Sequence, residues 1–186
     1  MTCTQENGEP VFRPATDSDF ALTGFAWFHE EQRYHRLPAR VLPHVNEGVQ
    51  NLTPHTAGGM LRFRTDSTTI AVDVALSGEI NHPVGMSRCG VAGFDLYQGS
   101  GPTKHFVANT RPQPGQTKAR VVLCGERDRT MEDWTLYFPL RTGVAELAVG
   151  LDADATLEPP TPFAVERPVL FYGSSITHGA CASRPG

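Results

Sequence analysis

The clearest pattern along the chain is an alternation of apolar and polar side chains with a period of two residues. Residues 59–64 alternate in this way, and residues 69–76 alternate again directly after the turn Thr65-Asp66-Ser67. Such alternation is typical of a β-strand that buries one face and exposes the other. Because the two runs are separated by so short a turn, the sequence predicts that they pair as a hairpin.

Further short apolar runs, separated by Gly and Pro turns, predict more strands at residues 92–97, 104–108, 119–124, 134–138 and 144–150. Phe25-Ala26-Trp27-Phe28 is read as another short strand followed by a return of the chain. Gly and Pro together make up 33 of 186 residues, about 18% against a usual level of about 12%. This composition favours short strands and turns over long helices. We therefore predict an all-β fold, an antiparallel β-sandwich of the jelly-roll kind, over residues 11–151.

Three other segments differ from this pattern. Residues 1–10 are polar and predict a flexible leader, while residues 152–167 begin with three prolines and three acids by position 162 and predict a linker. Residues 168–186 open with Val169-Leu170-Phe171-Tyr172, an unbroken apolar run typical of a strand covered on both faces in an α/β sheet. A single strand cannot form such a sheet. We expect the residues after about 163 to be disordered, to lie on the sandwich or to pair with a second copy.

Charge and composition exclude several classes of function. The formal net charge is −4 and no basic block occurs, so no nucleic acid is expected as a partner. The first 20 residues lack the apolar core of a secretory signal and no later stretch approaches a membrane span, so we expect no membrane partner and a cytoplasmic location. The four cysteines and seven histidines show no metal-ligand spacing, so we expect no metal site and no disulfide framework.

The candidate chemistry follows the apolar run at residues 169–172. Gly173-Ser174-Ser175-Ile176-Thr177 places small and hydroxyl residues where an α/β sheet presents a nucleophile or a phosphate loop. A serine nucleophile needs a base and donors for the developing oxyanion, and the first amides of a helix can supply donors. The alternative is that the serines only cap a helix. No lysine completes a phosphate loop, and Thr177 breaks the Gly-x-Ser-x-Gly pattern.

These residues also carry a resemblance to a known family. Residues 171–186 resemble the first conserved block of the SGNH (GDSL-like) esterase and acylhydrolase superfamily. Gly93-Phe94-Asp95-Leu96-Tyr97 is similar to the Gly-x-Asp-Leu-Tyr signature of the β-sandwich that precedes the catalytic domain in one branch of these enzymes. The segments 36–38, 55–58, 62–67 and 137–140 resemble the same sandwich. The resemblance covers most of residues 24–186.

The resemblance implies that Ser175 is the nucleophile, that its own backbone amide is one oxyanion donor, and that no cofactor is used. Ser174 stands where most of the family has aspartate. The family's Gly and Asn donors and its Asp-x-x-His base would lie beyond residue 186. His178 follows Ser175 by one helical turn, which places it behind the turn and not over the hydroxyl. We expect an N-terminal accessory domain of a serine esterase with negligible activity of its own, because loss of the base costs about 10⁴-fold in rate.

The partners implied are the missing catalytic domain and a small ester or acylated carbohydrate substrate, with a homo-oligomer formed through the sandwich or through strand 169–172 as a further possibility. The alternative function is a free-standing carbohydrate-binding sandwich, with Phe25, Trp27, Phe28 and Tyr34 as an aromatic platform. Core packing is the favoured role for these four side chains. For Asp95, a structural role, in which its carboxylate accepts backbone hydrogen bonds at a turn or pairs with an arginine, is favoured over a role toward the catalytic domain.

Overall fold

The computed structural model describes residues 8–78, 80, 84–165, 167–171, 173–179, 181 and 182. Its strands are β1 (Val11–Pro14), β2 (Ala21–Thr23), β3 (Met60–Thr65), β4 (Ile70–Leu76), β5 (Asp95–Gln98), β6 (His105–Asn109), β7 (Lys118–Cys124), β8 (Glu132–Tyr137), β9 (Val144–Leu151) and β10 (Leu157–Glu158). Its helices are α1 (Phe28–Glu31), α2 (Glu47–Leu52), α3 (Arg88–Ala92) and α4 (Ser175–His178), with 3-10 turns at Ala39–His44 and Gly101–Thr103.

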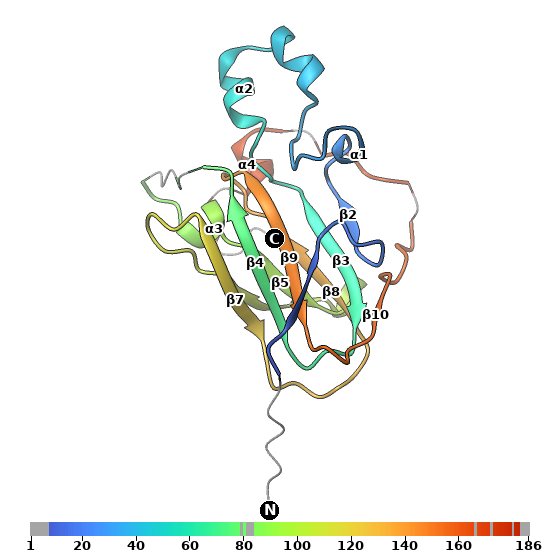
Figure 1. The fold of residues 1–186 in the computed structure, drawn as a ribbon. Helices are drawn as coiled ribbons and strands as arrows, with labels where there is room; N and C mark the ends of the chain where they lie inside the picture. Colours follow the sequence, from blue (N-terminus) through green and yellow to red (C-terminus); the bar gives the residue numbers. More distant parts are fainter. Residues whose placement is uncertain are drawn as a thin grey trace, which may run out of the picture.

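The strands form two antiparallel sheets that face each other as a β-sandwich, which confirms the predicted fold class (Figure 1). One sheet has the order β1-β9-β4-β7, and the other has the order β10-β3-β8-β5-β6 with β2 paired to β3. Helices α2 and α4 lie at one end of the sandwich (Figure 1).

The core lies between the two sheets because alternate side chains of each strand point inward. From the second sheet, Phe63 of β3 and Trp134 of β8 are completely buried. From the first sheet, Val72 of β4 and Val149 of β9 are completely buried as well. The period-two prediction for residues 59–64 and 69–76 therefore identified the inward faces correctly.

The predicted hairpin between these two runs is wrong. Strand β3 pairs with β8, β10 and β2, whereas β4 pairs with β9 and β7 in the other sheet. The chain crosses between sheets at residues 66–69, and hydrogen bonds across the crossing fix its path: the amide and hydroxyl of Thr68 donate to Asp152 Oδ2 over 2.6 and 2.7 Å. A period of two reports which face is buried but not which strand is the neighbour.

Two further local predictions are also corrected. Residues 25–28 form no strand, since the chain turns there and α1 begins at Phe28. The strand predicted from Ala92 begins only at Asp95, because Ser87 caps α3 with its hydroxyl and the helix continues to Ala92. Apolar runs of four or five residues suit a buried turn or a short helix as well as a strand.

The segment expected to be a linker contains β10, which pairs with β3 through Leu157 and Glu158. In the apolar run that follows Pro168, residues 169–171 form no strand and are 73–90% exposed. Tyr172, the last residue of that run, and residues 1–7 of the predicted leader lie outside the described residues. The sandwich thus extends past residue 151, and the part of the chain that carries Ser175 lies against one end of it (Figure 1).

Candidate functional site

The serine turn has a defined backbone conformation. Ser174 precedes the single turn of α4 with an extended ψ of −161°, and its side chain accepts no capping hydrogen bond. Gly179 ends the helix in the left-handed conformation, with φ 70°. A Cβ atom at Gly173 would lie 2.1 Å from the Thr177 hydroxyl, so the close approach of these two residues requires glycine. Ser175 is therefore the first residue of a short, glycine-bounded helix.

The side chain of Ser175 is exposed and has no activating group beside it. No histidine or carboxylate of the described residues hydrogen-bonds to its hydroxyl. The nearest histidine in the sequence, His178, is bonded elsewhere: its Nε2 lies 2.9 Å from the Leu140 carbonyl oxygen. Since a carbonyl can only accept, Nε2 carries the proton in this contact. The described residues thus present the hydroxyl without a base.

The bond from His178 fastens the serine turn to a polar cluster at the end of the sandwich. We call the side chains of Arg36, His55, Arg141 and His178 the arginine–histidine cluster. Burial, and after it the charges of Arg36, Arg141 and the neighbouring His178, lower the pKa of His55 to about 4. Burial also lowers the pKa of His178, against the raising effect of its bond to Leu140. Both imidazoles are therefore neutral at pH 7.

The aromatic side chains next to this cluster belong to the core. Phe25, Phe28 and Tyr34 are 5–7% exposed. The Tyr34 ring packs against Phe25, Phe28 and Phe138 with centroids 4.9–5.5 Å apart, and burial raises its pKa to about 12. Only Trp27 of the four predicted platform residues is half-exposed. The favoured prediction of core packing is confirmed for the other three.

The polar residues of segment 62–67 form hydrogen bonds with the chain that leads to the serine turn. The Thr65 hydroxyl donates to the Thr156 carbonyl oxygen over 2.7 Å, and Asp66 accepts from the Thr156 amide over 2.7 Å. Arg62 donates to the Thr161 carbonyl oxygen over 2.5 Å, and its guanidinium lies 3.7 Å above the Phe163 ring. We call residues 152–163 the strap. Sequence reasoning interpreted the segment as a linker because a strand of two residues leaves no periodic signal.

Two further contacts hold the strap between Thr156 and Phe163. Arg64 pairs with Glu158 at 3.1 Å. Asp133 on β8 accepts from both the amide and the hydroxyl of Thr161, over 2.8 and 2.6 Å. From Thr156 to Phe163 the strap is thus bound to strands β3 and β8 of the second sheet.

The residues of the segment 93–97 serve the architecture. A Cβ atom at Gly93 would lie 2.3 Å from the Cys89 carbonyl oxygen. Phe94 and Leu96 are completely buried, and Asp95 is 4% exposed and accepts a hydrogen bond from Asn109. The expected structural pairing of Asp95 is present, with Asn109 as the partner. The side-chain amide was not predicted, because position 109 is a neighbour only through the β5–β6 pairing.

Comparison with protein families now decides the classification. The family model described as "GxDLY: N-terminus of Esterase_SGNH_hydro-type" matches residues 11–157. The chain belongs to the GxDLY family. The match ends within the strap, at the first residue of β10, which agrees with a sandwich that extends beyond residue 151.

Solved structures support the same classification. A crystal structure described as a GDSL-like lipase from Bacteroides ovatus is 26% identical and has a TM-score of 0.78, with 95% of this chain and 50% of that chain covered. The salicylyl-acyltransferase SsfX3 of a tetracycline biosynthetic pathway has a TM-score of 0.59 at 19% identity, with 83% and 42% covered. A family two carbohydrate esterase from Cellvibrio japonicus has a TM-score of 0.52 at 15% identity, with 91% and 41% covered. The latter two show a shared fold alone. No curated protein matches.

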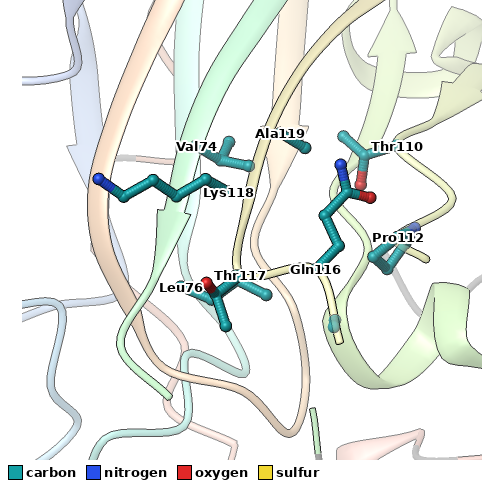
Figure 2. A pocket seen from close by; sticks show the side chains of 9 residues that line it. Val74, Leu76, Thr110, Pro112, Gln116, Thr117, Lys118 and Ala119 are labelled. Atoms are coloured by element: carbon teal, nitrogen blue, oxygen red, sulfur yellow. The ribbon is translucent and has the colours of Figure 1, made fainter. Parts of the chain in front are cut away.

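This GxDLY chain spans about half the length of the solved structures that it matches. Its described residues form a hollow of about 380 Å³ lined by Ile80, Arg88, Pro114 and Gly115, which lies away from Ser175 in the sequence. A second, small cavity of about 10 Å³ lies where β4 and β7 meet the segment 110–117. Figure 2 shows Val74, Ala119 and Gln116 around it. This volume suits a single water molecule and excludes an ester substrate.

Among the described residues, no three His, Cys, Asp or Glu side chains are grouped so that they could hold a metal ion. The described helices are all too short or too polar to cross a membrane.

Proposed function

We propose that this GxDLY chain is the N-terminal half of an SGNH-type serine esterase or acylhydrolase, in which Ser175 attacks the carbonyl carbon of an ester. In this mechanism the Ser175 oxygen forms a bond to the acyl carbon while a base takes its proton. The backbone amide of Ser175 donates to the oxyanion, and the alcohol leaves. The acyl group is then released by water. The base and the other oxyanion donors belong to polypeptide that follows.

The observation that carries this proposal is the exposed Ser175 hydroxyl at the start of α4, placed in a segment that resembles the first SGNH block. The backbone amide of the first helical residue has no partner within the helix, so it is available to an oxyanion. The short helix alone positions the Ser175 hydroxyl and this backbone amide. It does not activate the hydroxyl, because a serine remains protonated at neutral pH without a base.

The sandwich in this proposal is a rigid support for the serine turn. The strap is tied to β3 and β8, and His178 is tied to Leu140. The two attachments lie on either side of Ser175 in the sequence. They restrict where the turn can lie while the catalytic half folds around it.

Hydrolysis of p-nitrophenyl acetate tests the proposal. The 186-residue chain is expected to show no hydrolysis above the rate in buffer. A chain continued through a second half, as in the solved relatives, is expected to hydrolyse the ester, with a loss of about 10⁴-fold or more in Ser175→Ala and activity largely kept in Ser174→Ala. Hydrolysis by the longer chain that survives Ser175→Ala would contradict the proposal.

Acylated carbohydrate is the substrate class that we propose to assay first, as acetylated oligosaccharides. The alternative, a free-standing carbohydrate-binding sandwich, loses most of its predicted platform because Phe25, Phe28 and Tyr34 are buried in the core. Calorimetric titration with plain and acetylated oligosaccharides separates the two functions. We expect no heat of binding from the 186-residue chain, whereas saturable binding of the plain sugar would favour the binding module.

A further inference from the structure

The two arginines of the arginine–histidine cluster lack a counter-charge among the described residues. Five arginines of the described chain form ion pairs with carboxylates: Arg13, Arg40, Arg64, Arg120 and Arg129. No carboxylate of the described residues pairs with Arg36 or Arg141. A partly buried guanidinium normally has an anionic partner, because removing its charge from water costs free energy that only pairing recovers.

Hydrogen bonds link the segments that carry the cluster. Arg36 donates from Nη2 to the Leu52 carbonyl oxygen over 2.6 Å. His55 follows Leu52 by three residues. The hydroxyl of Thr56, the residue after His55, donates to the Pro139 carbonyl oxygen over 2.7 Å. The neighbouring Leu140 accepts from His178. The charges of Arg36 and Arg141 both act on His55 and on His178, so these four side chains lie near one another at this end of the sandwich.

Arg36 has donor capacity to spare at this place. Its Nε atom is buried and makes no hydrogen bond. Only the Nη2 bond to Leu52 occupies the guanidinium, which has five N–H donors in a planar fork. A buried N–H without a partner is unfavourable, because it has lost its hydrogen bonds to water. An acceptor that lies in the plane of the fork would remove this cost.

The cluster also lies next to the proposed nucleophile. His178 follows Ser175 by three residues in α4, and residues three apart are neighbours on a helix surface. A group bound to the cluster would therefore lie beside the Ser175 side chain.

We propose that the arginine–histidine cluster is a carboxylate-binding site. The planar fork of a guanidinium matches a carboxylate in a bidentate arrangement. Both histidines are neutral, so the positive charge of the site comes from the two arginines. The carboxylate comes either from the ester substrate or from an acidic side chain of the polypeptide that follows. Only this choice of source rests on the proposed function.

Nuclear magnetic resonance of the histidine rings tests the site in the 186-residue chain. Sodium acetate is titrated against sodium chloride at equal ionic strength. We expect saturable shifts of the His55 and His178 resonances with acetate alone, and a rise in the pKa of His55. Arg36→Gln and Arg141→Gln are each expected to weaken acetate binding at least about tenfold. Arg40→Gln is the matched control, because Arg40 is exposed and pairs with Glu30, and it should bind acetate as the wild type does.

The same titration of the chain continued through a second half identifies the source. If acetate still binds, the site takes a substrate carboxylate. If acetate no longer binds and the pKa of His55 is already raised, an acidic side chain occupies it. Equal shifts with chloride, or acetate binding that survives both Arg36→Gln and Arg141→Gln, would overturn the proposal. Ser175→Ala should leave binding unchanged, so a failure of the esterase assay and a failure of this titration are separate results.

Discussion

Protonation of His55 should make the stability of the fold depend on pH in a defined window. Its pKa is lowered from 6.5 to about 4, chiefly by burial and then by the charges of Arg36 and Arg141. The unfolded chain therefore binds this proton near pH 6.5, whereas the folded chain binds it only near pH 4. Because the unfolded state holds more protons between these values, the free energy of unfolding falls as the pH is lowered.

The size of the effect follows from the same values. Each pH unit across the window is worth 1.36 kcal/mol for one proton, so the limit between pH 7 and pH 4 is about 3 kcal/mol. The imidazole is only partly buried, and solvent reduces this to about 1–2 kcal/mol. The lowered pKa of His178 acts in the same direction.

Urea unfolding followed by tryptophan fluorescence is a suitable assay, since Trp134 is completely buried in the folded chain. The free energy of unfolding is measured at pH 7 and pH 4.5, in carboxylate-free buffers, for the wild type, His55→Gln and His44→Gln. His44 is exposed and serves as the control. We expect the fall in stability to be smaller by about 1–2 kcal/mol in His55→Gln alone. The reasoning is refuted if His55→Gln keeps the full pH dependence.

Three further predictions concern the strap and the core. Arg62→Met should raise amide exchange about tenfold across the strap, measured by mass spectrometry, with Arg40→Met unchanged; equal exchange in all three proteins would contradict the contacts. Asp152→Asn should lower the free energy of unfolding by about 1–3 kcal/mol at pH 7. Burial raises the pKa of Asp152, but the hydrogen bonds from Thr68 and Ser67 outweigh it, so the pKa is lowered. The difference in stability between wild type and variant should therefore shrink as the pH falls below 3.8. Phe138→Ala should cost about 3–5 kcal/mol in urea unfolding and Phe171→Ala, 78% exposed, less than about 0.5 kcal/mol; similar costs would disprove the core assignment.

The local alternation of apolar and polar residues predicted which strand faces are buried, whereas contacts between distant residues determine which strands are neighbours. The alternation around Phe63 and Val72 identified inward side chains correctly because a strand's side-chain period is fixed by its geometry. It could not place the two strands in different sheets, since that depends on bonds from Thr68 to Asp152, 84 residues away. The helix at Arg88–Ala92 was missed because a single turn contains too few residues for a 3.6-residue period.

The candidate site shows the same division. The position of Ser175 was predicted from the small residues around it and from a family resemblance. The arginine–histidine cluster was not predicted, because Arg36, His55, Arg141 and His178 come from four segments with no spacing in common. Only the fold brings these four residues together, and the sequence contains no motif that would indicate it.

The strap also sets the length of the tether that carries the serine turn. From Phe163, the last residue held by Arg62, ten residues lead to Gly173, and a fully extended chain of that length reaches at most about 36 Å. A polypeptide attached there searches a small volume, and the docking of a second half becomes an intramolecular event at high effective concentration. Insertions and deletions between positions 164 and 172 would change this reach gradually. Within the strap, an insertion or deletion of one residue would shift the register, and Thr65 and Arg62 would then face different backbone groups from those to which they donate now.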